Sequence, residues 1–331
     1  MMRRRVQPRG FAAGIAVVLA AAAVAIVTGM LGVMPASSQV QVVPVRSAAS
    51  VPGDDPFAAF WNDVQPVSVA LSAQNVTRPM GGGTVDTLRV RAAHDAKRLY
   101  VVSEWADTTE DTTIATTTSY SDAAAVEFPA AGTSRIPAFC MGDPTAGVNI
   151  WHWKAVWQND LDHGFTTNRK QYPDMQVDYY PQADDSTFQT GLAAGNPLAV
   201  REHTSPIENL VAAQFGTLTH ADVQDVSGVG RWKDGHWRVL FSRPLDGTEG
   251  APSFTPGQKT NAAFAVWNGS AGQRDGIKSV SQFVDLQISG EQIASHEDPL
   301  VPATVAFASI MTVLALVGVF GALQVQRARS K

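Results

Sequence analysis

The sequence is poor in cysteine and in clustered metal-binding side chains. Cys140 is the single cysteine in 331 residues, so the chain can form no internal disulfide and has no Cys-x-x-Cys-His motif for covalent haem attachment. Its seven histidines are scattered, with no His-x-x-x-His pair of the kind that ligates zinc. It also lacks a Gly-x-Ser-x-Gly nucleophile elbow, a phosphate-binding loop and a dinucleotide fingerprint. These absences argue against an enzyme that acts alone.

Basic charge is scarce in the middle of the chain. Seven of the 25 Lys and Arg residues lie at the two ends, which carry no acidic residue. The middle therefore holds 18 basic against 30 acidic side chains, a net charge of −12. Nucleic-acid binding needs a basic surface. We therefore expect no nucleic acid among the partners of this chain.

Long hydrophobic runs occur only at the ends. Residues 11–34 follow a cluster of arginines, and residues 300–323 precede Arg327, Arg329 and Lys331. About 20 apolar residues suffice to cross a bilayer, and flanking positive charge favours the cytoplasmic side. The first run is long for a signal peptide and no cleavage site stands out in it, although a cleaved signal would leave the same domain outside.

The expected organisation has three parts. Residues 1–35 are predicted to be an N-terminal transmembrane anchor or uncleaved signal, and residues 299–331 a C-terminal transmembrane helix with a short basic cytoplasmic tail. Residues 36–298 are predicted to be an external domain, held at the cell membrane on the extracytoplasmic side.

The middle of the chain is mostly of strand character. Six segments alternate or run apolar over five to seven residues and are rich in β-branched types: residues 67–71, 87–92, 99–105, 237–241, 262–267 and 283–288. Gly-containing turn signals separate them. Helical periodicity is weak apart from a possible turn at residues 207–215, within a polar, strand-poor stretch at 159–219. The pattern predicts a mainly β protein, an antiparallel β-sandwich flanked by two transmembrane helices.

Two side chains are candidate metal ligands. Met141 lies in the Gly/Pro-marked loop Pro137-Ala-Phe-Cys-Met-Gly-Asp143, just before a tryptophan-rich segment predicted to be a buried strand. A thioether there could ligate haem iron, although most methionines simply fill apolar cores. Lys278 follows a Gly-rich turn and opens a strand; it could be an exposed edge charge. A buried amine, however, loses its proton and could coordinate iron.

The other candidates have simpler explanations. Asp107, Glu110 and Asp111 could bind calcium, but a solvated turn is commoner. His152 should point to the opposite strand face from its two tryptophan neighbours, and we interpret it as structural or exposed. The eight tryptophans suit a sandwich core, yet together they could also wall a flat apolar cofactor or bind sugar rings. Composition does not separate these alternatives.

A set of motifs along the middle of the chain resembles a known family. In order they are Leu88-Arg-Val-Arg-Ala-Ala-His-Asp95, Val102-Ser-Glu-Trp-Ala-Asp-Thr108, Asp122-Ala-Ala-Ala-Val-Glu-Phe-Pro129, Phe139-Cys-Met-Gly-Asp143, Val148-Asn-Ile-Trp-His-Trp-Lys154, Gly235-His-Trp-Arg-Val239, Ser242-Arg-Pro-Leu245, Ala263-Phe-Ala-Val-Trp-Asn-Gly269 and Lys278-Ser-Val-Ser281. Together they resemble the haem-b-binding gamma subunits of ethylbenzene dehydrogenase, dimethylsulfide dehydrogenase and related type II dimethyl sulfoxide reductase-family enzymes. The resemblance spans about residues 67–288.

The resemblance implies a β-sandwich that holds one non-covalent haem b. Its axial ligands would be Met141 and Lys278, and we expect Trp151 and Trp267 to contribute to the cofactor site. Lys259 is a competing candidate but lacks the motif, and Cys140 is not implied as a ligand. Two protein ligands leave the iron no open position, which suits electron transfer rather than oxygen chemistry.

The implied function is that of a membrane-anchored b-type cytochrome subunit. It would relay electrons for a molybdenum-containing oxidoreductase complex, with a molybdopterin catalytic subunit and an iron–sulfur subunit as partners. The chain departs from the family pattern in its two apolar ends, in its polar stretch at 159–219, and in Phe283, where tryptophan is common. The alternative function is a surface-anchored β-sandwich that binds carbohydrate or another ligand without haem.

Overall fold

The computed structural model describes residues 41–114, 116–165, 168–176, 203–248 and 250–290. Both apolar runs that the sequence predicts to cross a membrane lie outside these ranges. Within them, no helix combines the length and apolar character needed to span a bilayer. The described part of the chain is mainly β, as predicted.

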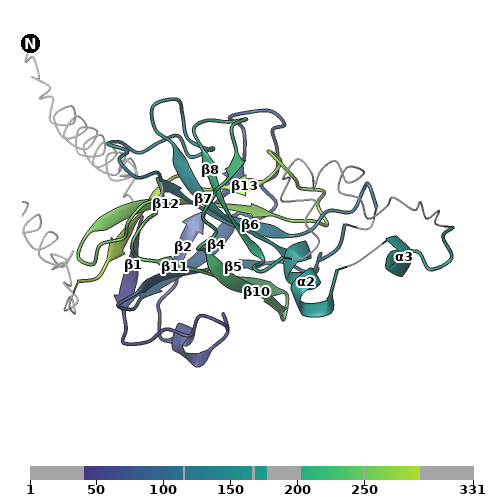
Figure 1. Cartoon of the computed structure of the whole chain (residues 1–331), viewed down its shortest axis with the longest axis horizontal. Helices are drawn as coiled ribbons and strands as arrows, with labels where there is room; N and C mark the ends of the chain where they lie inside the picture. Colours follow the sequence, from purple (N-terminus) through teal and green to yellow (C-terminus); the bar gives the residue numbers. More distant parts are fainter. Residues whose placement is uncertain (1–40, 115, 166–167, 177–202, 249, 291–331) are drawn as a thin grey trace, which may run out of the picture. The chain divides into compact units, whose positions relative to one another are not determined.

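Strands are the predominant regular secondary structure of the described residues (Figure 1). In chain order they are β1 (Val42–Ser47), β2 (Val67–Ala70), β3 (Ser72–Ala73), β4 (Thr87–His94), β5 (Arg98–Ala106), β6 (Ala123–Pro129), β7 (Val148–Lys154), β8 (Ile207–Ala212), β9 (Thr219–His220), β10 (Ser227–Lys233), β11 (His236–Pro244), β12 (Lys259–Trp267), β13 (Ser279–Val280) and β14 (Val284–Ile288). The helical elements are η1 (Ala59–Asn62), α2 (Ala155–His163) and α3 (Asn168–Gln171). All six segments predicted as strands overlap a strand of the structure.

The helical turn expected at residues 207–215 is wrong. Ile207–Ala212 form β8, which pairs antiparallel with β7, so that Leu210 lies opposite Ile150. Pairing with a neighbouring strand buries nearly the whole segment. This tertiary gain outweighs the weak local helical pattern.

The strands form one continuous mixed sheet rather than a purely antiparallel sandwich. Their spatial order is β10-β11-β5-β4-β1-β14-β12-β6-β7-β8-β9. Consecutive pairs such as β4/β5, β6/β7 and β10/β11 are antiparallel. Strand β1, however, runs parallel to β4, with Val45 opposite Ala92. Parallel neighbours need a long connection, and the chain between β1 and β4 supplies it through η1, β2 and β3.

Strand β12 changes its pairing partners along its length, and there the sheet bends from one half to the other. Its first residues, up to Ala262, pair with β14, and its last residues, from Ala263 to Trp267, pair with β6. Along that second part β13 replaces β14 as the other neighbour. The strand therefore belongs to both halves of the sheet and joins them.

The two halves meet at a shared apolar core, where β6, β7 and β8 cross β4, β5 and β11 (Figure 1). Trp105 and Trp237 lie opposite each other on β5 and β11, and the Trp153 ring from β7 packs on Trp237 at 4.9 Å between centroids. A side chain at Gly230 would come within 2.2 Å of the Trp153 ring, so glycine makes this contact possible. Burying one aromatic ring contributes roughly 4–6 kcal/mol before the entropy cost of ordering it.

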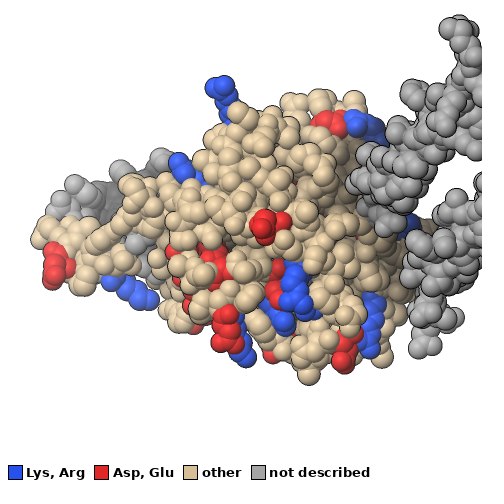
Figure 2. Space-filling model, turned by 180° about the vertical axis from the view of Figure 1, so that it is seen from behind, with Lys and Arg blue, Asp and Glu red and all other residues tan. Residues whose placement is uncertain are grey.

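Charged side chains are mixed in sign on the face drawn in Figure 2. There the lysines and arginines lie among aspartates and glutamates instead of gathering into one basic area. One carboxylate can hold several cations: Glu104 forms ion pairs with Arg89, Arg91 and Arg238. On the face drawn in Figure 2, the described residues form no continuous positive patch of the kind that tracks a phosphate backbone.

Candidate cofactor site

The outer face of β6, β7 and β12 is turned away from the shared core. Alternate residues of a strand project to opposite sides, so Val126 enters the core while Ala125 and Glu127 project outward. In register, Ala125 lies between Ala265 of β12 and His152 of β7. Because alanine side chains are short, the centre of this face is hollow.

A cavity of about 480 Å³ lies over this floor. Its size falls within the roughly 300–1,000 Å³ of small-molecule and cofactor sites. Three of the four residues predicted to bind the cofactor line it: Met141, Lys278 and Trp267. Met141 and Lys278 are far apart in the sequence, and the fold brings them to the same space.

Met141 sits in a backbone conformation that few residues other than glycine adopt. Its φ is +66°, in the left-handed region, and Gly142 follows with φ +76°. For a non-glycine residue this conformation costs about 1–3 kcal/mol and persists only where surrounding contacts hold it. Here the Met141 N–H donates to Oε2 of Glu127 at 3.1 Å, and the Gly142 N–H donates to the Ala138 carbonyl at 3.0 Å. These bonds fix the loop that carries the thioether.

The ammonium group of Lys278 is enclosed by the cavity wall. Nζ lies 4.8 Å from the centre of the Trp267 ring, and among the described residues no carboxylate forms an ion pair with it. Burial lowers the pKa of Lys278, and neighbouring acidic groups, chiefly Cys140 and Glu127, offset this only in part. Burial disfavours the charged form, so this amine gives up its proton, and frees its lone pair, more easily than an exposed lysine does.

The backbone of Lys278 is clamped by a loop between β3 and β4. The Lys278 N–H donates to the Gly81 carbonyl, and the Gln74 N–H donates to the Lys278 carbonyl, both at 3.1 Å. The Gln74 side chain also donates to the Gly276 carbonyl at 3.1 Å. Gly82, with φ +96°, lies against the Lys278 backbone so closely that an added Cβ would be 2.3 Å from its carbonyl oxygen. The position of the amine thus depends on this glycine.

We expect Gly82→Ala to displace Lys278. The added methyl group meets backbone rather than a flexible side chain, so the clamp must open, at a cost of about 2–3 kcal/mol in the free energy of unfolding. Denaturant unfolding of the full chain measures this cost. Gly132→Ala is the matched control, because Gly132 has a similar positive φ of +74° with open space around it. Equal losses in the two variants would contradict the proposed contact with Lys278.

Glu127 is a buried carboxyl group beside both predicted ligands. Burial raises its pKa to about 8, although the Met141 N–H and the Lys278 charge act in the opposite direction. Its Oε1 is out of contact with solvent and has no hydrogen-bond partner among the described residues. At neutral pH the group is therefore mostly protonated. The sequence offered one signal for it, an outward-facing acid on an otherwise apolar strand.

Glu127→Gln is expected to change the pH dependence of stability in the cofactor-free protein. The folded state keeps the Glu127 proton up to about pH 8, whereas the unfolded chain loses it near pH 4.3. Between these values the folded state binds more protons, so stability falls as pH rises. The amide removes this penalty and should stabilise the protein by about 2–4 kcal/mol above pH 8, with little change at pH 5.

Denaturant unfolding at pH 5, 7 and 8.5 measures that difference. Asp122, whose pKa burial raises to about 7, contributes to the same slope. The curve of the variant should therefore become shallower without becoming flat. An unchanged slope in Glu127→Gln would show that this carboxyl group titrates normally.

His152 lines the cavity rather than serving only the fold. As expected from strand alternation, it faces away from Trp151 and Trp153. Its ring packs on Trp267 with centroids 4.9 Å apart, and its Nε2 has no hydrogen-bond partner among the described residues. Burial, reinforced by two neighbouring ammonium groups, holds the pKa of His152 well below its usual range. A neutral imidazole therefore forms part of the wall.

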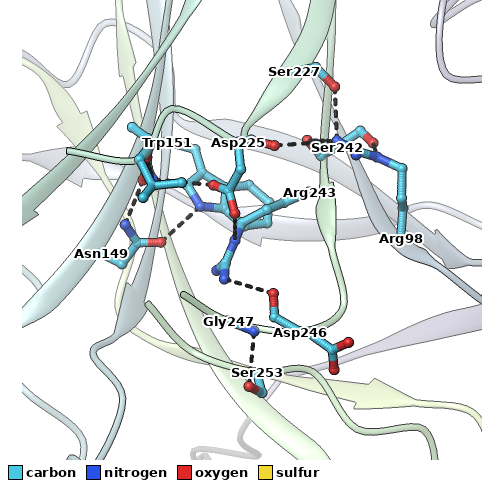
Figure 3. Close-up of polar contacts among 12 residues, drawn as sticks. Arg98, Asn149, Trp151, Asp225, Ser227, Ser242, Arg243, Asp246, Gly247 and Ser253 are labelled. Carbon is cyan, nitrogen blue, oxygen red and sulfur yellow. Dashed lines mark hydrogen bonds and ion pairs between the residues drawn. The ribbon is translucent and has the colours of Figure 1, made fainter. Parts of the chain in front are cut away.

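Trp151 lies on the core face of β7 and does not line the cavity; Figure 3 shows its contact with Asn149. Its indole N–H donates to Oδ1 of Asn149 at 2.9 Å, and its ring packs on Phe128 at 4.5 Å. The fully buried Arg243 lies nearby, paired with Asp225 at 3.3 Å. Of the two tryptophans predicted to bind the cofactor, the structure brings only Trp267 to the cavity.

Two other candidates are placed elsewhere. Lys259 is 59% exposed in its side chain and pairs with Asp285 at 3.5 Å, outside the cavity. The Asp107 carboxylate accepts hydrogen bonds from Thr109 and Asn268 and is thus satisfied by protein donors. In the described part of the chain, no group of three or more His, Cys, Asp or Glu residues could hold a metal ion.

The arrangement is suited to holding a flat apolar group with a metal at its centre. The floor is apolar, and the walls offer a soft thioether and an amine whose pKa is lowered by burial. A thioether is an established ligand of haem iron, and a deprotonated amine has a lone pair to donate. Haem fits this donor set and this floor without requiring a carboxylate cluster.

Comparisons with known proteins identify several similar chains. Residues 58–279 match the sequence pattern of a family described as ethylbenzene dehydrogenase. "Putative respiratory nitrate reductase heme subunit ORF7" of Haloferax mediterranei is 31% identical over 274 residues, covering 81% of this chain and 82% of that protein. "Chlorate reductase subunit gamma" of Ideonella dechloratans is 28% identical over 271 residues, covering 81% and 92%.

Among solved structures, a family 9 carbohydrate-binding module of Caldicellulosiruptor kristjanssonii in complex with cellotriose is similar with a TM-score of 0.40 and 12% identity. The match covers 77% of this chain and 97% of that chain. A likeness this distant says nothing about ligands.

Proposed function

The chain belongs to the ethylbenzene dehydrogenase family, and we propose from that membership and from the cavity that it is a haem-binding subunit that relays electrons in a molybdenum-containing oxidoreductase complex. Its similarity to a nitrate reductase haem subunit and to a chlorate reductase gamma subunit supports this function. The catalytic centre for the substrate would then lie on another subunit.

The proposed cofactor is haem b, held by Met141 and Lys278. One observation carries this assignment: the two side chains, distant in sequence, line one cavity, in which burial lowers the pKa of the amine. The cofactor would supply reversible one-electron transfer. The protein orients the donors through Glu127 and Gly82 and excludes water with the apolar floor. Trp267 would pack beside the cofactor.

The proposed partners are a molybdopterin catalytic subunit and an iron–sulfur subunit. With Met141 and Lys278 both holding the iron, the chain would exchange electrons and would leave no position at the iron for oxygen or substrate. The apolar runs at residues 11–34 and 300–323 support attachment to the membrane, with residues 36–298 on the extracytoplasmic side. Electrons would then pass between the complex and a carrier in or near the membrane.

A pyridine haemochrome spectrum of the purified full chain tests the proposal. We expect the spectrum of haem b at about one equivalent per chain, extractable by acid acetone because no cysteine pair can attach it. A protein produced with adequate haem supply that shows no Soret band would overturn the proposal and favour the haem-free binding module.

A further inference from the structure

The rim of the cavity differs in chemistry from one part to the next. Exposed apolar side chains make up part of it, namely Ile114, Phe215 and Leu218. Another part is polar and cationic, formed by Tyr120 and Arg274. Haem b carries two propionate carboxylates at one edge, and these cannot be buried on the apolar floor without a large desolvation cost. The opposite edge of haem b carries apolar vinyl groups. A rim with a cationic part and an apolar part would therefore bind the two edges at different places.

Arg274 is held ready at this rim. Its guanidinium carbon lies 4.5 Å from the centre of the Tyr120 ring, and Nη1 donates to the Gly272 carbonyl at 2.9 Å. Stacking on an aromatic ring limits the motion of the guanidinium, so less entropy is lost when it binds an anion. Among the described residues no carboxylate forms an ion pair with it.

The other cations that line the cavity are engaged differently. Lys154 is paired with Glu208 and lies over the Trp157 ring at 3.7 Å. Lys278 is enclosed and is the proposed iron ligand. Among the described lining residues, Arg274 is thus the cation whose side chain is exposed and still has N–H groups available to donate to a ligand.

The loop that carries Arg274 also carries the proposed iron ligand. The turn from Arg274 to Ile277 is closed by a backbone bond of 2.8 Å, and the carbonyl of Asp275 accepts the Trp267 indole N–H at 3.0 Å. One short segment therefore fixes a wall residue, a rim cation and Lys278 relative to one another. This segment would therefore link two contacts with the cofactor: the one that Arg274 makes at its edge and the one that Lys278 makes at its central iron.

We propose that Arg274 would bind the propionate carboxylates of the cofactor and so strengthen its binding. This inference rests on the proposed haem function. Arginine matches carboxylates with two parallel N–H donors. A charge-assisted pair of this kind contributes about tenfold or more in affinity.

The test compares two ligands on four proteins. Cofactor-free full-length wild type, Arg274→Ala, Arg274→Lys and Arg231→Ala are titrated with haem b and with haem dimethyl ester, whose carboxylates are blocked, and Kd is read from the Soret band. Wild type should bind haem about tenfold more tightly than the ester. Arg274→Ala should bind both alike, at the affinity of wild type for the ester, and Arg274→Lys should be intermediate. Arg231, an exposed arginine away from the cavity, should leave the tenfold difference unchanged.

The other outcomes separate this inference from the proposed function. If Arg274→Ala weakens haem and ester equally, the residue acts on the fold or on Lys278 and the inference is wrong. If haem binds wild type and Arg274→Ala with the same Kd, the inference also fails while the haem function stands. If wild type binds neither ligand, the proposed function fails, and this inference with it.

Discussion

Replacing Lys278 with alanine is expected to convert a low-spin, six-coordinate haem spectrum to that of a five-coordinate iron and to weaken haem binding at least about 100-fold. Removing even an outer partner of a metal ligand commonly costs 10–100-fold in affinity, and here a ligand itself is removed. Optical and electron paramagnetic resonance spectra of the full chain report the change of ligand, and a haem titration reports the affinity.

Lys259→Ala is the matched control for Lys278→Ala. Lys259 has the same side chain, lies on the strand that leads into the same loop, and is exposed outside the cavity. The control should leave spectrum and affinity unchanged. A spectral change in Lys259→Ala with none in Lys278→Ala would reassign the ligand. No change in either would leave the iron without a lysine ligand.

Lys278 should also make the cofactor-free protein sensitive to pH. Burial lowers its pKa in the folded state, so between the folded and unfolded pKa values the unfolded chain binds more protons. Stability therefore rises with pH in that window, and the penalty is fully present below the folded pKa. Lys278→Met should remove the penalty and stabilise the cofactor-free fold while abolishing amine ligation. The wild-type amine accordingly serves binding at the expense of stability.

Filling the floor of the cavity is expected to have the second large effect. Ala125 lies at the centre of the floor, and Ala125→Phe places a ring where the cofactor would lie. We expect haem affinity to fall at least about 100-fold, since a closely packed site cannot hold both groups. The cofactor-free fold should be unharmed or up to about 2 kcal/mol more stable, because the ring fills an apolar cavity.

Ala106→Phe provides the matched control for the filled floor. Ala106 is an exposed alanine at the end of β5, outside the cavity, so the same substitution there should leave haem binding intact. Haem titration and thermal unfolding of both variants give the two readouts. A normal Soret band and Kd in Ala125→Phe would mean that the cofactor does not lie over β6.

Local patterns predicted strands well but could not tell which face of a strand borders the cavity. Strand alternation predicts that the side chains of His152 and Trp151 project from opposite faces of the strand, and the structure confirms this. Which of the two faces is buried depends on how the sheet turns over at β12, a long-range property. For that reason Trp151 was expected at the cofactor and lies in the core, whereas His152 was interpreted as structural or exposed and lines the cavity.

The candidate iron ligands could not be identified from the spacing of residues in the sequence alone. Local chemistry alone left Met141 as an ordinary core residue and Lys278 as an edge charge; the order of the motifs suggested a pair, and the fold brings both to one cavity. Glu127 and Gly82 were not predicted as parts of the site, because their roles arise from contacts with distant segments. The roles of these two follow from hydrogen bonding and close approach, which the sequence does not display.

Strand β12 imposes an order on the maturation of the protein. The loop with Lys278 follows a strand that is shared by both sheet halves, and the loop with Met141 follows β6, which pairs with it. Contacts between such distant segments form late, since a long loop must close first. A partly synthesised chain therefore has no place for the cofactor. Under the proposed function, haem would have to meet a finished domain, in whichever compartment folding is completed, and the empty protein would have to survive long enough to be loaded.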